Sequence, residues 1–192
     1  MYRRQWRYGM GQACLAKPTG VEPFSRIQGY VIRIGIFMID QEHWFCKARF
    51  GLFVHYSLFS MLERGEWVMN RERISKAGMR ALAEQFDPCA FDANRYCDLA
   101  VEAGMRYVSL TTMHHEGFRL YDTELSDFNA KAYVGRDLVQ EFVEAARERG
   151  LRVSLYHSLN NWFDAPDAAD ALESEDAYEL FMGNTHERIK EL

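Results

Sequence analysis

The sequence of 192 residues lacks most of the features that mark specialised protein classes. It has no apolar run near the ~20 residues of a membrane-spanning helix, and no apolar stretch of a signal peptide follows its basic start. It also has no glycine-rich phosphate loop and neither an HxH nor an HExxH metal motif. The formal net charge is −5, so the basic face of a nucleic-acid-binding protein is missing. We therefore expect no nucleic-acid or membrane partner, no cofactor and no bound metal.

Cysteine is scarce, and its spacing is uninformative about metals. Cys14, Cys46, Cys89 and Cys97 form no CxxC pair and no other spacing typical of a metal site. We expect buried free thiols. Such thiols favour a reducing compartment, and hence a cytoplasmic location. Nothing else in the sequence indicates the compartment.

What is present suits a folded domain, because 48% of the residues are hydrophobic and 27% are charged. The length is short for a closed (β/α)8 barrel, which needs about 250 residues. Residues 1–37 contain several glycines and prolines and show little periodicity. We expect these residues to form a poorly defined N-terminal extension, with Met38 as an alternative start and the main domain over 38–192.

Apolar periodicity predicts alternating helices and strands after residue 50. Asp92 and Asp137 are placed to cap two of the helices, and Gly104 and Gly150 to end them. The expected helices contain residues 79–86, 92–103, 137–146 and 176–192. The expected strands contain residues 50–55, 105–111 and 151–156.

The order of helix, glycine and apolar run occurs twice, in residues 102–110 and again in 148–155. This repetition is typical of α/β proteins with a parallel sheet. Each expected strand ends in polar ring side chains, as strands do where a barrel enzyme builds its site. We therefore favour the N-terminal portion of a (β/α)8 TIM barrel, incomplete in this chain. A doubly wound open sheet is the alternative, although no phosphate loop supports it.

The most distinctive feature is the adjacent pair His114 and His115, which follows an apolar run and precedes Gly117. Successive strand residues point to opposite faces. Both imidazoles can therefore reach one ligand only where the strand ends and the chain bends. The pair indicates a ligand site at the carboxyl end of this strand.

Four segments of the sequence together form a recognisable series of motifs. They are Arg49–Ser57, Gly65–Arg71, Leu110–Phe118 and Ser154–Trp162. In this order they resemble the α-L-fucosidases of glycoside hydrolase family 29. The resemblance covers roughly residues 42–192 and does not extend to residues 1–37.

The resemblance implies a (β/α)8 barrel followed by a β-sandwich, and retaining hydrolysis of terminal α-L-fucose. Retention needs two carboxyl groups roughly 5–5.5 Å apart. In the family the nucleophile is an aspartate at the end of the fourth strand, and the acid/base residue lies later. Both are expected beyond Leu192, so we expect no catalytic residue here. With about three βα units, the chain alone should be inactive and poorly stable.

The resemblance also implies a fucose pocket in this chain. Imidazoles and a carboxylate can bind the ring hydroxyls, and an indole can cover apolar ring surface. The implied partner is a fucosylated glycan or fucoside. The expected substrate-binding residues are His55, Glu66, Trp67, His114, His115 and Tyr156.

Other residues near these motifs are weighed differently. We expect the His157 side chain to point away from that of Tyr156, and either to pack in the interior or to support the pocket residues. Glu116 should brace the histidine loop without taking part in chemistry. Trp162 and Asp164 are as well explained by ordinary loop roles as by substrate contact.

Two other functions stay open at this point. The first is a non-catalytic carbohydrate-binding relative, since the catalytic carboxylates are absent from the sequence. The second is a barrel metallohydrolase with His55, His114 and His115 as ligands, although adjacent histidines rarely ligate one ion. The sequence also leaves open the linkage, L-galactose as an alternative sugar, and the oligomeric state.

Overall fold

The computed structural model describes residues 24–27, 30–33 and 43–192. The chain divides into two units, residues 1–41 and 42–192. In the first unit, β1 (Phe24–Ile27) and β2 (Tyr30–Arg33) form an antiparallel pair. The rest of the expected extension, including Cys14, lies outside the described residues, as does Met38.

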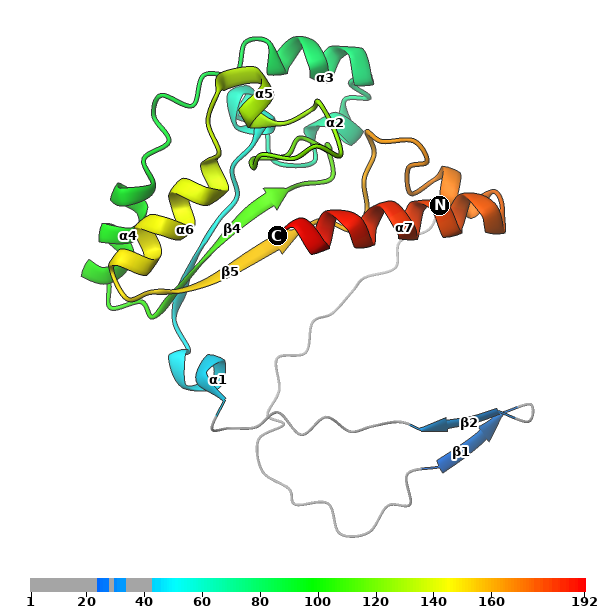
Figure 1. The fold of residues 1–192 in the computed structure, drawn as a ribbon, viewed down its shortest axis with the longest axis horizontal. Coiled ribbons are helices and arrows are strands. Elements are labelled where there is room, and N and C mark those ends of the chain that lie inside the picture. Colours follow the sequence, from blue (N-terminus) through cyan, green and yellow to red (C-terminus); the bar gives the residue numbers. More distant parts are fainter. Residues whose placement is uncertain (1–23, 28–29, 34–42) are drawn as a thin grey trace, which may run out of the picture. The chain divides into compact units, whose positions relative to one another are not determined.

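The second unit alternates helices with parallel strands (Figure 1). None of the helices in the described residues is long and apolar enough to cross a membrane. The strands are β3 (Gly51–Val54), β4 (Tyr107–Met113) and β5 (Arg152–His157). The helices are α1 (Trp44–Ala48), α2 (Val68–Arg71), α3 (Lys76–Ala83), α4 (Ala93–Glu102), α5 (Ala130–Val134), α6 (Leu138–Glu148) and α7 (Glu175–Glu191), with short 3-10 helices η1 (Leu58–Leu62) and η2 (Asp170–Leu172).

The three strands form one parallel sheet in the order β3-β4-β5. Leu52 lies opposite Val108, which lies opposite Val153, so the strands run in register. The predicted α/β class is confirmed. Because the strands are parallel, their carboxyl ends meet at one edge of the sheet. The polar ring side chains at the strand ends therefore lie at this edge.

The two faces of the sheet differ in what covers them. Helices α4 and α6 cover one face (Figure 1) and pack their apolar residues against alternate strand residues. On the other face Phe53 is 49% exposed, whereas its neighbour Val54 is buried. This alternation follows from the strand period of two. The core on the helix side includes Val54, Cys97, Ala100, Val108, Leu110, Phe142 and Ala146.

The predicted helix caps are present. The Asp92 carboxylate accepts a hydrogen bond from the Arg95 backbone N–H at 3.0 Å, and Asp137 accepts one from Gln140 at 2.8 Å. These bonds satisfy N–H groups that have no partner within the helix. They fix where α4 and α6 begin, and so how the next strands enter the sheet.

Most element boundaries differ from the sequence predictions by one or two residues, and the differences at α3 and β4 are the clearest. Helix α3 ends at Ala83, and Phe86 is buried in the turn that follows. Strand β4 begins two residues later than expected and continues to Met113. Helices α1, α2 and α5 were not predicted, because four or five residues are too few to show an apolar period.

The cysteines correct one prediction. Cys97 is buried, as expected, but Cys46 is half-buried and Cys89 is exposed; all three are free thiols. Cys89 lies in the loop before α4, where its backbone N–H binds the Asp87 carboxylate at 2.9 Å. The expectation of buried thiols is therefore wrong for Cys89, because this position serves a turn and not the core.

Candidate functional site

The carboxyl edge of the sheet brings three strand ends together. His55 follows β3, His114 follows β4, and Tyr156 is the second-last residue of β5. The ring centroids of His55 and His114 are 5.6 Å apart. The Tyr156 ring lies 5.7 Å from His55 and 6.3 Å from His114. Three residues predicted from strand-end positions thus form one group.

A bulge near the end of β4 sets the direction of the histidine pair. Thr111 lies opposite Tyr156, but Met113 lies opposite His157, so Thr112 is an additional residue in β4. The Thr112 hydroxyl donates to the Tyr156 carbonyl at 3.1 Å and fixes the bulge. Bulges bend a strand and redirect its side chains. The end of β4 is therefore turned just before the two histidines.

The histidine turn, residues His114 to Gly117, follows this bulge. The two imidazole centroids are only 4.5 Å apart. The Gly117 N–H donates to the His114 carbonyl at 2.9 Å and closes the turn. Gly117 has a φ of +82°, and a Cβ there would lie 2.5 Å from the Phe163 Cβ. The turn therefore requires glycine for both its dihedral angle and its contact.

Two tryptophans extend the site beside His115. The Trp67 ring, 41% exposed, lies 5.3 Å from His115. The Trp162 ring lies 4.8 Å from His115 and 5.3 Å from Trp67. The Trp162 backbone N–H donates to the His115 carbonyl at 2.8 Å. The loop after β5 is thereby attached to the histidine turn, and Trp162, which the sequence left open, joins the group.

His114 is the most enclosed of these rings, at 2% exposure. Burial lowers its pKa to about 4, and the imidazoles of His115 and His55 add to this effect. Glu66 raises the pKa of His114, so Glu66 lies close to this ring. His114 is therefore neutral at neutral pH. Its buried Nδ1 has no hydrogen-bond partner among the described residues.

Glu116 is fully buried within the histidine turn, behind the rings. Burial raises its pKa to about 7, while the Ser57 hydroxyl and the start of η1 lower it. Neither carboxyl oxygen reaches hydrogen-bond geometry with the described residues. Glu116 thus lies between the histidine turn and the segment after His55, a position that suits bracing.

Adjacent residues of β5 face opposite ways. The His157 Nδ1 lies 2.9 Å from the Thr112 hydroxyl, and its ring is 6.4 Å from Tyr121, away from the histidine turn. Asp164 also turns away from the rings, toward Arg119. The expected separation of Tyr156 from His157 is present in the structure.

Two phenylalanines in the site were not found from the sequence. The Phe53 ring lies 4.5 Å from His55 and 5.6 Å from Tyr156. The Phe59 ring lies 5.5 Å from His114. Strand alternation could have placed Phe53 on the same face as His55. Phe59 lies in η1, where no periodic signal exists.

We call the group of rings and Glu66 the ring group. It comprises His55, Glu66, Trp67, His114, His115, Tyr156 and Trp162. It offers imidazole and phenol groups for hydrogen bonds, one carboxyl group and aromatic surface, a combination that suits a polyhydroxylated ring with an apolar side. A cavity of about 480 Å³ lies elsewhere, between α4 and α6. Among the described residues no three His, Cys, Asp or Glu side chains are arranged to hold a metal ion.

Comparison with known proteins agrees with these motifs. The family model for alpha-L-fucosidase matches residues 38–192. The mouse tissue alpha-L-fucosidase is 37% identical over 140 residues, which are 62% of this chain and 30% of that protein. The human plasma alpha-L-fucosidase is 34% identical with the same coverage. The chain thus spans about a third of the length of these relatives.

Solved structures give the same result. A family 29 alpha-L-fucosidase from Bacteroides thetaiotaomicron superposes with a TM-score of 0.72 and 28% identity, over 77% of this chain and 36% of that one. The alpha-L-fucosidase AlfC from Lactobacillus casei, in complex with its alpha-L-fucose product, gives 0.63 and 32%, over 69% and 45%. With the family model covering most of the chain, these matches establish that it belongs to the alpha-L-fucosidase family, glycoside hydrolase family 29.

Proposed function

We propose that this chain forms the fucose-binding part of a retaining α-L-fucosidase. The enzyme would remove terminal α-L-fucose from a fucosylated glycan or fucoside. The residues proposed to bind the sugar are His55, Glu66, Trp67, His114, His115 and Tyr156.

The convergence of strand-end rings at one edge of the sheet carries this proposal. Fucose has three ring hydroxyls and a methyl group. The neutral imidazole of His114 can both donate and accept hydrogen bonds, and its buried Nδ1 is a group that a hydroxyl could satisfy. The Trp67 ring provides apolar surface beside His115. Membership of the family supports the same ligand, and the L. casei relative binds α-L-fucose.

We further propose that residues 38–192 are the first three βα units of a (β/α)8 barrel, with residues 1–37 as an extension. Three parallel strands with helices on one face support this. Within the described sheet, β3 and β5 each pair along one side only. In a closed barrel both free sides would be paired, and the exposed Phe53 would face the barrel interior.

The nucleophile and the acid/base residue are proposed to lie in segments other than this chain. Glu66 lies close to His114, and Glu116, in the histidine turn, is fully buried. The purified 192-residue chain is therefore expected to give no steady release of chromophore from an aryl α-L-fucoside. Sustained turnover that follows the concentration of the chain would contradict this assignment.

Sugar binding can be tested without catalysis. L-Fucose is expected to bind the 192-residue chain weakly in saturation-transfer NMR, and His114→Ala should weaken binding about tenfold or more, because a desolvated hydrogen-bonding group is lost. His186→Ala, an exposed histidine on α7, is the matched control. Equal binding by the His114→Ala variant, with its fold intact, would refute the proposed role of the ring group in sugar binding. L-Galactose measured in parallel tests whether the methyl group is recognised.

A further inference from the structure

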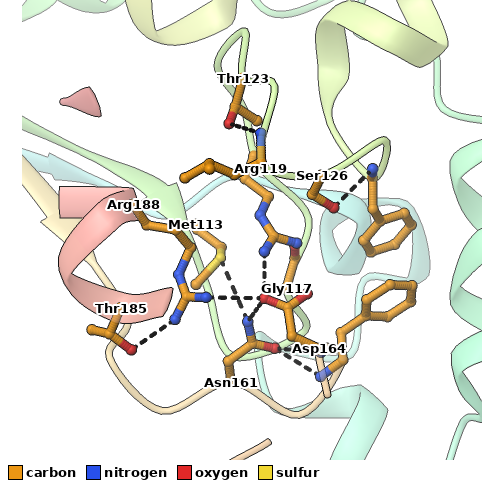
Figure 2. A network of polar contacts seen from close by, with 12 residues as sticks. Met113, Gly117, Arg119, Thr123, Ser126, Asn161, Asp164, Thr185 and Arg188 are labelled. Atoms are coloured by element: carbon orange, nitrogen blue, oxygen red, sulfur yellow. Dashed lines mark hydrogen bonds and ion pairs between the residues drawn. The ribbon is translucent and has the colours of Figure 1, made fainter. Parts of the chain in front are cut away.

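Two buried arginines share a single carboxylate behind the histidine turn (Figure 2). Arg119 follows β4 and is 2% exposed; Arg188 lies on α7 and is 4% exposed. Both donate to Oδ2 of Asp164, Arg188 at 3.1 Å. Within the described part of the chain, Asp164 is the one carboxylate that pairs with either guanidinium. The cluster therefore contains one buried positive charge in excess.

The remaining donors of these arginines are only partly used. Arg119 donates through Nη1 to the Gly117 carbonyl at 2.5 Å, and Arg188 through Nη2 to the Thr185 hydroxyl at 2.8 Å. The Nε atoms of both are buried and have no hydrogen-bond partner among the described residues. Buried charged donors without partners are costly, because the desolvation of the group is not compensated.

Both arginines and Asp164 line a cavity of about 260 Å³. Leu125 and Ala165 give the cavity an apolar side, and Asn184 gives it a side-chain amide. Glu187 also lines it, but its carboxylate binds Lys190 at 2.6 Å and its side chain is 57% exposed. Glu187 therefore does not neutralise the buried arginines.

The charge of the cluster reaches its neighbours. Burial lowers the pKa of His157 to about 4, and Arg188 and Arg119 add to the effect, while Asp164 opposes it. Burial also lowers the pKa of Arg188; the Asp164 carboxylate opposes this shift, and the charge of Arg119 adds to it. His157 is thus neutral at neutral pH and adds no charge to the cluster. Two guanidinium groups beside one carboxylate leave a positive charge that favours an anion.

We propose that this cavity binds a small organic carboxylate. Its carboxylate would bind the guanidinium groups of Arg119 and Arg188, and its carbon part would contact Leu125 and Ala165. One excess positive charge matches a monoanion better than a phosphate dianion. Planar guanidinium groups match the geometry of a carboxylate.

This site is separate from the ring group but connected to it. Arg119 holds the carbonyl of Gly117, the last residue of the histidine turn. Asp164 lies two residues after Trp162 in the same loop. A carboxylate that orders the two arginines would also stiffen the turn and the loop that carry His115 and Trp162.

The test compares sodium butyrate with butyramide, its neutral analogue, on the 192-residue chain at constant ionic strength. Butyrate should raise the unfolding temperature in a saturable way, as a ligand of the native state does, and should give a binding isotherm in calorimetry. Butyramide and added sodium chloride should not. The proposal would be overturned if butyramide or sodium chloride stabilised the chain as much as butyrate does. It would also be overturned if butyrate did not stabilise the chain.

Variants locate the site. Arg188→Met removes the excess charge but keeps the Arg119–Asp164 pair, so the chain should fold and lose butyrate binding at least tenfold. Leu125→Trp places bulk in the cavity while keeping both arginines, and it should also abolish binding. Arg64→Met, in an exposed pair with Glu72, is the control and should bind normally. Unchanged butyrate binding in Leu125→Trp or Arg188→Met would refute the assignment.

Discussion

The ring group and the ionic cluster share the segments after β4 and β5 but differ in burial and charge. Among the rings of the ring group, those of His55 and Trp67 are exposed, whereas His114 is buried and neutral. The ionic cluster, which comprises Arg119, Asn161, Asp164 and Arg188, is mostly buried and charged. Both draw on the segments after β4 and β5. Nearby positions in one loop thus belong to the ring group and to a buried scaffold.

The difference shows how the scaffold supports the ring group. Asn161 accepts hydrogen bonds from the backbone N–H groups of Phe163 and Asp164, at 2.8 and 3.1 Å, and donates to Asp164 at 2.7 Å. These bonds fix the loop in which Trp162 faces the rings. Buried polar groups therefore hold the backbone of this loop, so the Trp162 side chain does not have to.

The largest effect is expected from removing the shared charge of the ionic cluster. Asp164→Asn leaves two buried guanidinium groups without a counter-charge and should lower the free energy of unfolding by about 3–5 kcal/mol. Asp127→Asn, in an exposed pair with Arg80, should cost less than about 1 kcal/mol. Urea denaturation measures both. Equal losses would mean that the cluster is no more important than a surface ion pair.

Gly117 joins the two regions, so its replacement should disturb both. Gly117→Ala should cost about 2–3 kcal/mol, because it combines an unfavourable positive φ with a contact against Phe163. Gly135→Ala is the matched control, since its φ of +73° is similar and no atom lies within 4 Å of the added Cβ. It should cost about 1 kcal/mol. Similar losses in thermal unfolding would show that the close contact is unimportant.

Acid should lower the free energy of unfolding through His114, in the ring group, and through His157, beside the ionic cluster. His114 and His157 have pKa values lowered from 6.5 to about 4, so the unfolded chain takes up protons first as the pH falls. Their contribution is complete above pH 6.5 and is lost toward pH 4. His157→Gln should make this loss shallower in denaturation measured across the range. An unchanged slope would indicate that His157 does not titrate abnormally.

Glu116 should act in the opposite direction. Its pKa is raised from 4.5 to about 7, so its contribution is complete below pH 4.5 and is lost as the pH rises through about 7. Glu116→Gln should therefore stabilise the chain near pH 8 and have little effect near pH 4.5. The measurement compares the change in the free energy of unfolding that Glu116→Gln causes at the two pH values. A loss of stability near pH 8 would show that the carboxylate itself is needed.

Much of the fold could be predicted because local patterns report it. The apolar period placed α4 and α6, and Asp92 and Asp137 cap them as expected. The short helices α1, α2 and α5 gave no such pattern. Cys89 was misplaced because composition reports an average burial for a residue type, whereas Cys89 lies in an exposed turn.

The site could be predicted in part. Strand-end positions and the family motifs were enough to group His55, His114, His115 and Tyr156, which the structure brings together. Their role in binding fucose stays a prediction. Nothing in the sequence around Arg188 indicates a buried residue, because α7 is a polar helix and the partner of Arg188 lies in another loop.

The sequence by itself determined the alternation of helices with parallel strands, and hence that polar strand ends meet at one edge. It did so because periodicity and capping act over a few residues. Only the tertiary structure decided how the bulge at Thr112 directs the histidine pair, and that Arg119 and Arg188 share Asp164. These features depend on the packing of distant segments, where burial and the pairing of charges are settled together.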